Sequence, residues 1–464
     1  MGECKIKTTC DDLDNFLSSL SQPSIPSVQI LHNASPTTQH HGDSDTLVSS
    51  TGTEAYRCKC SFQIIADGND DLAFVVRENG TICHLPDGIF APANFRIRQA
   101  MKCLINLLNN NKRSDHTFSR LRENLTSATF DTSWNEKECL LTLHYGPPGI
   151  SQSCLEEWKQ EAQIVCDECQ FVRVTGRSKG IKLFVSGSTY AAPVAAADNP
   201  ILEEGIIQDT LWLTLRDISI DDSSIQRVES VSMVQPNQSL DSRCVKIRYQ
   251  KPATAFQHPN AGVMLTSLHW ILNTLTKVSQ NADRTKLRLL EMYNGAGTHT
   301  IPLAKSMLLS EIIAVELDER LVTACRNNCR LNNCLKGEAS DQDQTLVEVF
   351  KGDAAEWASK TLRSIHKKNK ISKDTTPISN NEANSYNEFD ILLVDPPRQG
   401  LDATVCEMAI KGTFTQLIYI SCGRRALIRD LTLLCTDFDL EDVAVIDLFP
   451  GTDAVETLIH LKRK

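Results

Sequence analysis

The sequence contains no long apolar run and no recognisable leader segment. No stretch reaches the roughly 18 apolar residues that a membrane-spanning helix needs. The first residues lack the apolar core of a secretory signal, and Asp11, Asp12 and Asp14 are atypical of a transit peptide. An intracellular protein is therefore predicted, with the cytoplasm favoured over an organelle or the nucleus.

A repeating cysteine framework is also missing. The 17 cysteines are odd in number and scattered, which fits reduced intracellular thiols better than a set of disulfides. Cys166 and Cys169 form a single CxxC, and Cys58 with Cys60 is a poor second pair for zinc or an iron–sulfur cluster. We therefore predict no metal site.

An excess of basic residues is likewise absent, because 48 Lys and Arg stand against 58 Asp and Glu, a net charge of −10. An acidic average does not suggest nucleic acid, but binding needs only a local basic face. Residues 96–122 supply such a stretch, which is either a solvated helix face or an RNA-binding surface. Its members are Arg96, Arg98, Lys102, Lys112, Arg113, Arg120 and Arg122.

Three segments differ in character. Residues 1–50 are polar and are predicted to be a disordered tail. Residues 51–240 mix strand and helix patterns, including a hairpin over 62–76 and a helix over 93–108, and predict an α+β RNA-binding domain. Residues 241–464 alternate strand and helix, which predicts an α/β domain with a parallel sheet. Within it, residues 360–387 are predicted to be a flexible insert.

The predicted strands of the last domain end in residues that carry chemistry. Parallel strands cover 287–292, 312–315, 347–350, 391–394 and 417–420, and an antiparallel pair covers 443–449 and 455–461. Ligands of open α/β sheets bind beyond the carboxyl ends of the strands. We therefore expect the residues after each strand to share one pocket.

The first two strands predict a nucleoside-type cofactor. Gly295 and Gly297 follow the first strand, and Glu316 ends the second, where a carboxylate can bind a ribose diol. Asp353, after the third strand, is placed to face an adenine. Thr300 stands where a dinucleotide fingerprint needs glycine, so S-adenosylmethionine, which has no phosphate, is favoured.

Cys422 follows the fifth strand, and Glu456 begins the last one. A buried structural cysteine and an ordinary edge-strand glutamate are the plain alternatives. As a pair they suit methylation of uracil carbon 5: a thiolate adds at carbon 6, and a base later removes the carbon 5 proton. Arg424 and Arg425 are expected to lower the pKa of the thiol. Arg398, after Asp395-Pro-Pro, suits uracil oxygens or phosphate.

These segments closely resemble the tRNA (uracil-5-)-methyltransferase family. The resemblance runs from about Tyr56 to Leu461 and rests on Leu290-Glu-Met-Tyr-Asn-Gly-Ala-Gly297, Asp395-Pro-Pro-Arg-Gln-Gly-Leu401, Tyr419-Ile-Ser-Cys422 and Phe449-Pro-Gly-Thr-Asp-Ala-Val-Glu456. It implies a class I, Rossmann-like S-adenosylmethionine methyltransferase domain behind the α+β domain. It also implies Cys422 as nucleophile and Glu456 as proton acceptor.

The resemblance further implies a substrate and its contacts. The expected substrate is the T-arm of tRNA, methylated to 5-methyluridine at position 54 of the T-loop, by a monomer. Cofactor contacts are expected at His258, Tyr293, Gly295, Gly297, Thr298, Glu316, Asp353 and Asp395. Substrate contacts are expected at Phe256, Asn260, Arg398, Arg57 and Arg177.

The chain departs from the family pattern at four places. His258 stands for a glutamine, Gly423-Arg424 for Asn-Pro, Asp453-Ala454 for a His-His or similar pair, and Asn294 for a cysteine. Two alternatives therefore stay open: methylation of uracil in ribosomal RNA, and a tRNA-binding folding helper with weak catalysis.

Overall fold

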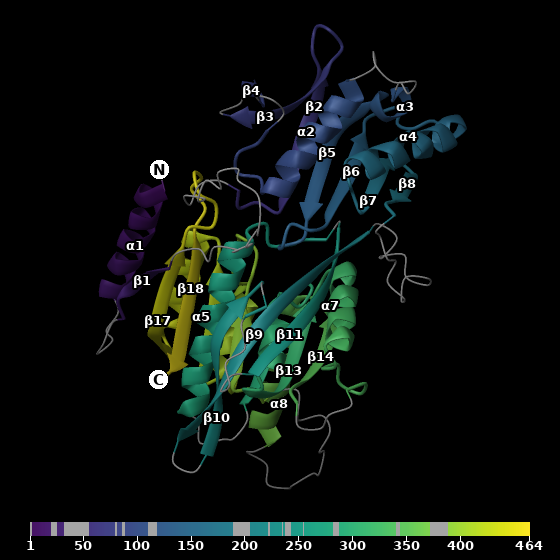
Figure 1. Ribbon diagram of the computed structural model, residues 1–464. Coiled ribbons are helices and arrows are strands. Elements are labelled where there is room, and N and C mark those ends of the chain that lie inside the picture. The colour runs from purple at the N-terminus through teal and green to yellow at the C-terminus, as the bar shows by residue number, and fades with distance from the viewer. Residues whose placement is uncertain are drawn as a thin grey trace. The chain divides into compact units, whose positions relative to one another are not determined.

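The computed structural model divides the chain into two compact units (Figure 1). Unit 1 comprises Met1–Thr37, Thr210–Arg248 and Gly262–Lys464, and unit 2 comprises Thr38–Asp209 and Tyr249–Ala261. The structure describes residues 2–19, 26–31, 55–78, 81–85, 89–109, 118–188, 205–220, 223–233, 235–236, 243–253, 255–281, 287–339, 344–371 and 388–464.

Unit 1 is built on an eight-stranded sheet in the order β1-β17-β18-β16-β15-β12-β13-β14. The five predicted parallel strands are confirmed, and each lies within two or three residues of its predicted bounds. They are β12 (Leu287–Met292), β13 (Leu309–Glu316), β14 (Leu346–Lys351), β15 (Ile391–Val394) and β16 (Gln416–Ser421). The antiparallel pair is also confirmed, as β17 (Phe438–Ile446) and β18 (Glu456–Arg463).

Helices alternate with these strands along the chain. They are α5 (Ala261–Gln280), α6 (Thr300–Lys305), α7 (Glu319–Leu331), α8 (Ala354–Ile371), α9 (Ala403–Lys411) and α10 (Arg424–Leu434). Strands covered on both faces must be apolar throughout, and β15 is buried at all four positions. Unit 1 therefore has the Rossmann-like arrangement predicted for it, with strand ends and helix starts along one edge of the sheet.

The amino-terminal segment corrects the prediction of a disordered tail. Residues Gly2–Ser18 form helix α1, and Val28–Leu31 form strand β1, which pairs in parallel with β17 from Val28↔Val443 to Leu31↔Ile446. Leu13 and Leu17 are almost fully buried in the core of unit 1. Apolar residues spaced three and four apart give α1 one apolar face, which this core covers. Residues 32–50 lie outside the described part of the chain.

Unit 2 contains a seven-stranded sheet in the order β4-β3-β2-β5-β6-β7-β8. Its elements are β2 (Lys59–Ala66), β3 (Leu72–Glu78), β4 (Thr81–His84), α2 (Phe95–Asn109), α3 (Ser119–Arg122), β5 (Leu125–Thr132), β6 (Cys139–Tyr145), α4 (Leu155–Glu168), β7 (Arg173–Ser178) and β8 (Ile181–Ser186). The predicted hairpin is present as β2 and β3. Trp158 of α4 is completely buried, and Gly176 leaves room for its ring.

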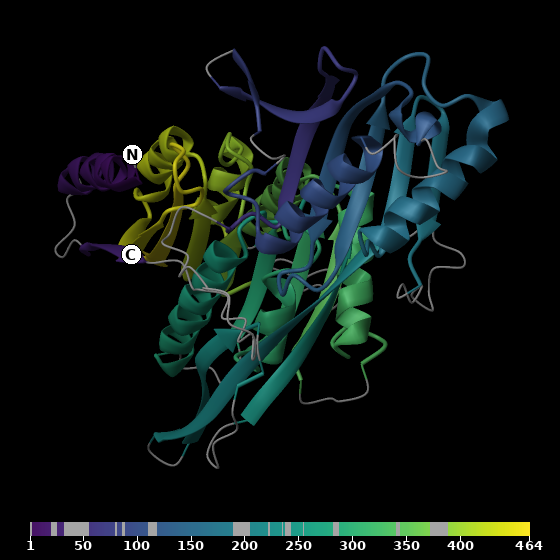
Figure 2. The ribbon, with the colours of Figure 1, turned by 45° about the horizontal axis from the view of Figure 1, so that its top comes forward.

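A three-stranded sheet follows in the order β10-β9-β11, from β9 (Ile206–Ile220), β10 (Ser223–Ser232) and β11 (Arg243–Pro252) (Figure 2). Residues 210–248 belong to unit 1, and the chain then returns to unit 2. This differs from the single predicted boundary at residue 240. In the predicted flexible insert, α8 continues to Ile371, and residues 372–387 lie outside the described part of the chain.

Candidate active site

The register of two antiparallel strands brings Cys422 and Glu456 together. Pairing of β16 with β18 ends at Ser421↔Thr457, so one further step places Cys422 opposite Glu456. Opposite residues of an antiparallel pair have Cα atoms about 4.5–5.5 Å apart and side chains on the same face. Glu456 is buried, and Cys422 is half-buried. A thiol and a carboxyl group therefore share one end of the sheet.

The electrostatic surroundings of Cys422 keep its thiol protonated. Burial raises the pKa of Cys422, and the nearby carboxyl groups of Glu456 and Asp395 raise it further, whereas Arg398 lowers it. The predicted lowering of this pKa by Arg424 and Arg425 is wrong. The side chain of Arg424 forms an ion pair with Asp12 instead (Nε to Oδ2, 3.1 Å).

The loop after β15 lies against the turn after Cys422. A Cβ atom built on Gly423 would overlap the carbonyl oxygen of Arg398, so only glycine fits this close approach. This explains why a residue with a side chain cannot follow Cys422 in this chain. The turn also keeps Arg398 within electrostatic range of the thiol.

A buried acid that the sequence analysis missed anchors this loop. The carboxylate of Asp430 in α10 is fully buried and accepts hydrogen bonds from Leu401 N (2.8 Å), Tyr419 Oη (2.7 Å) and Arg429 Nε (2.8 Å). Arg429 also donates to the carbonyl oxygens of Gln399 and Leu401. Asp430 therefore ties residues 399–401 to β16, the strand that carries Cys422. An acid within the amphipathic pattern of α10 was the available signal.

Three acids, Asp395, Glu456 and Glu291, interact at this end of the sheet. Burial raises the pKa of Asp395 well above its usual range, and the carboxyl groups of Glu456 and Glu291 raise it further. Burial also raises the pKa of Glu291 to about 8, while a hydrogen bond from Thr300 Oγ1 (2.7 Å) partly opposes this. Like charges this close do not all ionise, so the site carries protonated carboxyl groups at neutral pH. The charged residue within the apolar strand 287–292 was a signal for Glu291.

The turn after β12 has the geometry of a nucleoside site. Tyr293, Gly295 and Gly297 all have left-handed backbones (φ 64°, 58° and 86°). A Cβ atom on Gly295 would meet no protein atom within 4 Å, so the backbone there is open to a ligand. At Gly297 a Cβ atom would press on the sulfur of Cys325, so this glycine serves the packing of α7.

Glu316 ends β13 beside this turn. Its carboxylate accepts hydrogen bonds from the backbone N–H groups of Gly295 (2.9 Å), Leu317 (2.8 Å) and Asp318 (2.9 Å). Two carboxylate oxygens offer about four acceptor positions, so capacity remains for a ribose hydroxyl. The buried Asn294 Oδ1 has no hydrogen-bond partner. An open glycine, a fixed acid and an orphaned acceptor fit the adenosyl half of S-adenosylmethionine.

Three more of the predicted cofactor residues lie at the same edge. Thr298 is half-buried within the turn. Asp353 is exposed at the start of α8 and accepts a hydrogen bond from Glu356 N (3.0 Å). Burial raises the pKa of Tyr293 to about 12, and its ring packs on the core of unit 1. The structure therefore gathers Tyr293, Gly295, Thr298 and Asp353 around the ends of β12, β13 and β14.

The remaining predicted residues belong to unit 2. Phe256 is 74% exposed, whereas Asn260 is buried and forms a backbone bridge with Arg57. His258 Nδ1 accepts a hydrogen bond from Asn260 N (3.2 Å), so this histidine braces its own loop. Arg57 and Arg177 are half-buried.

Most described members of the basic stretch bind oxygen atoms of their own unit. Arg96 donates to the carbonyl oxygens of Cys169 and Gln170, and Arg98 to that of Ala93. Arg120 pairs with Glu157 (2.6 Å) and Glu123, and Arg122 pairs with Asp70 (3.0 Å). Lys102 is exposed, and residues 112 and 113 lie outside the described part of the chain. The stretch is therefore mainly structural, which weakens its interpretation as an RNA surface.

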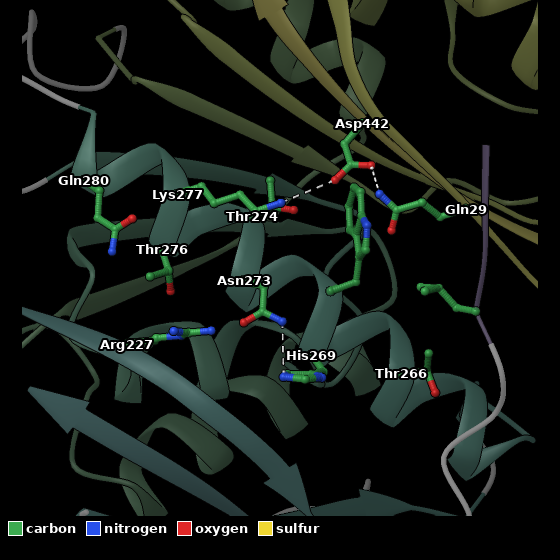
Figure 3. A pocket seen from close by; sticks show the side chains of 12 residues that line it. Gln29, Arg227, Thr266, His269, Asn273, Thr274, Thr276, Lys277, Gln280 and Asp442 are labelled. Carbon is green, nitrogen blue, oxygen red and sulfur yellow. Dashed lines mark hydrogen bonds and ion pairs between the residues drawn. The ribbon is translucent and has the colours of Figure 1, made fainter. Parts of the chain in front are cut away.

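A cavity of about 550 Å³ lies elsewhere in unit 1, beside α5 and β17 (Figure 3). Asp442 binds Gln29 (2.7 Å) and Lys277 (3.7 Å) across it, and His269 binds Asn273 (3.2 Å). Asp442 pairs with His460, four positions along β17 from the Ile446↔Glu456 pair, so this cavity is separate from the candidate active site.

Among the described residues no cluster of acids, histidines and cysteines suits a metal ion, and none of the described helices is long and apolar enough to cross a membrane.

The fold and site define an S-adenosylmethionine-dependent methyltransferase. Residues 220–464 match the tRNA (Uracil-5-)-methyltransferase family, more than half of the chain, and the chain therefore belongs to that family. The tRNA/tmRNA (uracil-C(5))-methyltransferase of Pseudoalteromonas atlantica is 25% identical over 88% of both chains. That of a Marinomonas species is 31% identical over 47% of this chain and 52% of its own.

A solved structure shares the fold over nearly the whole chain. The Pyrococcus abyssi tRNA (uracil-54, C5)-methyltransferase in complex with S-adenosyl-L-homocysteine has a TM-score of 0.55 and 15% sequence identity. The match covers 99% of this chain and 83% of that one. At this identity the likeness concerns the fold.

Proposed function

We propose that this enzyme methylates carbon 5 of uridine 54 in the T-loop of tRNA, through a covalent adduct between Cys422 and carbon 6 of the base. The observation that carries the proposal is the register of β16 and β18, which ends at Ser421↔Thr457, one step from Cys422 and Glu456. The substrate is argued from family membership and from relatives named for tRNA or tmRNA. The position is argued from the Pyrococcus enzyme, whose name specifies uracil-54.

The chemistry follows from the weak nucleophilicity of carbon 5. The Cys422 thiolate adds to carbon 6, which moves an electron pair onto carbon 5 and its adjacent carbonyl. When bound, S-adenosylmethionine would supply an electrophilic methyl group for carbon 5 and would leave as S-adenosylhomocysteine. Glu456 accepts the carbon 5 proton, the double bond re-forms, and the bond between carbon 6 and Sγ breaks to regenerate the thiolate. The base must leave its stack to be reached from both faces.

The residues around the pair have supporting roles in this scheme. Arg398 carries the positive charge that favours the thiolate, and it also suits a uracil oxygen or phosphate. Burial and the neighbouring carboxyl groups raise the pKa of Asp395, which favours its protonated form, and this form can donate a hydrogen bond to a uracil carbonyl. Gly295, Glu316 and Asn294 are positioned to hold the adenosyl group.

Two variants test the two roles. Cys422→Ala should abolish both methylation and the adduct with RNA containing 5-fluorouridine, whereas Cys154→Ala, a half-buried thiol of unit 2, should retain both. Glu456→Gln should form the adduct with ordinary uridine RNA and release it slowly, because the carbon 5 proton remains. Normal turnover by either active-site variant would overturn the assignment.

Mapping the product tests the substrate. Unmodified tRNA and ribosomal RNA should be incubated with the enzyme and labelled cofactor, and the methylated nucleotide located in each. Label confined to the T-loop uridine supports the proposal, and label in ribosomal RNA alone would favour the ribosomal alternative. If the Cys422→Ala variant refolds tRNA at the wild-type rate, the protein also acts as a tRNA folding helper, independently of methylation.

A further inference from the structure

Helix α1 lies outside the family match at residues 220–464, yet it packs beside the strands that end in the active site (Figure 1). Leu13 and Leu17 are buried in the core of unit 1, and Ile6, Cys10 and Phe16 pack against that core. β1, which follows α1, adds a strand next to β17. The helix is therefore a fixed part of unit 1, beside the segment that leads into β18.

Lys5 of α1 binds the segment that precedes Glu456. Its ammonium group donates to the carbonyl oxygens of Phe449 (2.8 Å) and Ala454 (3.0 Å) and forms an ion pair with Asp447 (2.5 Å). The ammonium group thus makes two hydrogen bonds and one ion pair, all to residues 447–454. Lys5 is only 7% exposed, so water cannot replace it without rearrangement. Both ends of residues 447–454 are thus held by one side chain.

The same helix contacts the turn that follows Cys422. Asp12 pairs with Arg424, two residues beyond the thiol. Between them lies Gly423, where a Cβ atom would overlap the carbonyl oxygen of Arg398. The Asp12 and Arg424 side chains are 42% and 38% exposed, so this pair is weaker than the buried Lys5 cluster.

Both contacts fall two residues from the proposed catalytic pair, at Ala454 before Glu456 and at Arg424 after Cys422. We propose that α1 is a positioning element of the active site, in which Lys5 fixes the segment before Glu456 and Asp12 fixes the turn after Cys422. This inference rests on the proposed roles of Cys422 and Glu456. It assigns a function in catalysis to a segment that carries no catalytic residue.

The two contacts act on different chemical steps, which makes the proposal testable. Carbon 5 of 5-fluorouridine carries fluorine in place of the proton, so its adduct forms through Cys422 and does not need Glu456 to accept a proton. Turnover of ordinary uridine RNA needs both residues. Loss of Lys5 should therefore slow turnover more than it slows adduct formation.

The test compares Lys5→Met with Lys7→Met, an exposed lysine of the same helix. Lys5→Met should lower kcat about 10-fold or more, because small displacements of a catalytic group are costly. KM for RNA and the adduct rate with 5-fluorouridine RNA should stay within about 2-fold of wild type. Lys5→Arg should recover part of the loss, and Lys7→Met should match wild type.

The final amount of 5-fluorouridine adduct counts the folded sites in each sample, so kcat is expressed per folded site. A wild-type kcat per site for Lys5→Met, or equal losses of kcat and adduct rate, would overturn the inference. If wild type itself formed no adduct, the proposed function would fail first, whatever α1 does.

A second pair of variants tests the contact between α1 and the turn after Cys422. Asp12→Asn should slow adduct formation about 2-fold, as expected for an exposed ion pair, while Asp11→Asn, an exposed neighbour, should not. The double variant Asp12→Arg, Arg424→Asp should restore the rate. Equal rates for Asp12→Asn and Asp11→Asn would remove Asp12 from the proposal.

Discussion

Glu291 makes the stability of unit 1 depend on pH in a direction that can be calculated. It is only 2% exposed, and burial raises its pKa from an ordinary 4.5 to about 8. A carboxyl group whose pKa is raised by folding contributes to the stability of the folded state. The contribution is full below the unfolded pKa and is lost as pH rises through the folded pKa. The affected window is therefore pH 4.5 to about 8. A pKa shift of one unit corresponds to about 1.4 kcal/mol, so unit 1 loses up to about 5 kcal/mol of unfolding free energy across this window.

Glu291→Gln removes this titration and keeps an acceptor for the Thr300 hydroxyl. The difference in unfolding free energy between this variant and wild type, measured by urea unfolding from pH 5 to pH 9, should grow in favour of the variant. Glu311→Gln is the matched control, since hydrogen bonds from Lys336 and Arg288 help lower the pKa of Glu311 and keep it ionised throughout. Its difference from wild type should stay constant. A constant difference for Glu291→Gln would refute the raised pKa.

The remaining predictions concern the site's framework. The rate of adduct formation by Cys422 should rise about tenfold per pH unit from pH 6 to pH 8, because its raised pKa leaves little thiolate. A rate that does not change with pH in single-turnover assays would contradict this. Gly423→Ala should lower kcat and melting temperature together, since its Cβ atom displaces the Arg398 carbonyl, and calorimetry with a turnover assay checks both. Asp430→Ala should cost about 3–5 kcal/mol in urea unfolding, and Tyr419→Phe about 1 kcal/mol, because the first leaves several buried donors unpaired.

The sequence predicted the catalytic half of the fold well for a physical reason. Buried parallel strands are mainly apolar, as residues 391–394 are throughout, and a polar residue such as Asp395 marks the strand end. Strand order and register were not needed for the prediction that Cys422 and Glu456 meet. The alternation of strand and helix already places their ends at one edge.

The amino-terminal helix was missed although its signal was present. Ile6, Cys10, Leu13 and Leu17 recur at helical spacing, but the surrounding polar residues dominate the composition of the segment. The Lys5 contacts join residues more than 440 positions apart, and no local pattern reports such pairs. The same limit applies to Asp430, whose partners Leu401 and Tyr419 lie outside its own helix.

The division of the chain between its units was also beyond local patterns. β9 and β11 each pass from one unit to the other, at residues 209–210 and 248–249. A strand pattern indicates an extended segment and its buried face, but not the unit to which each half belongs. The pKa of Cys422 was mispredicted for a related reason, since its neighbours in space are Glu456, Asp395 and Arg398 rather than the adjacent arginines.

Mass spectrometry of a trapped complex tests the central claim most directly. The enzyme should be incubated with cofactor and T-arm RNA containing 5-fluorouridine at the target position, digested with protease and nuclease, and fragmented. The account predicts a methylated fluorouridine attached through sulfur to Cys422. An adduct on another cysteine, or methylated RNA with no protein attached, would contradict it.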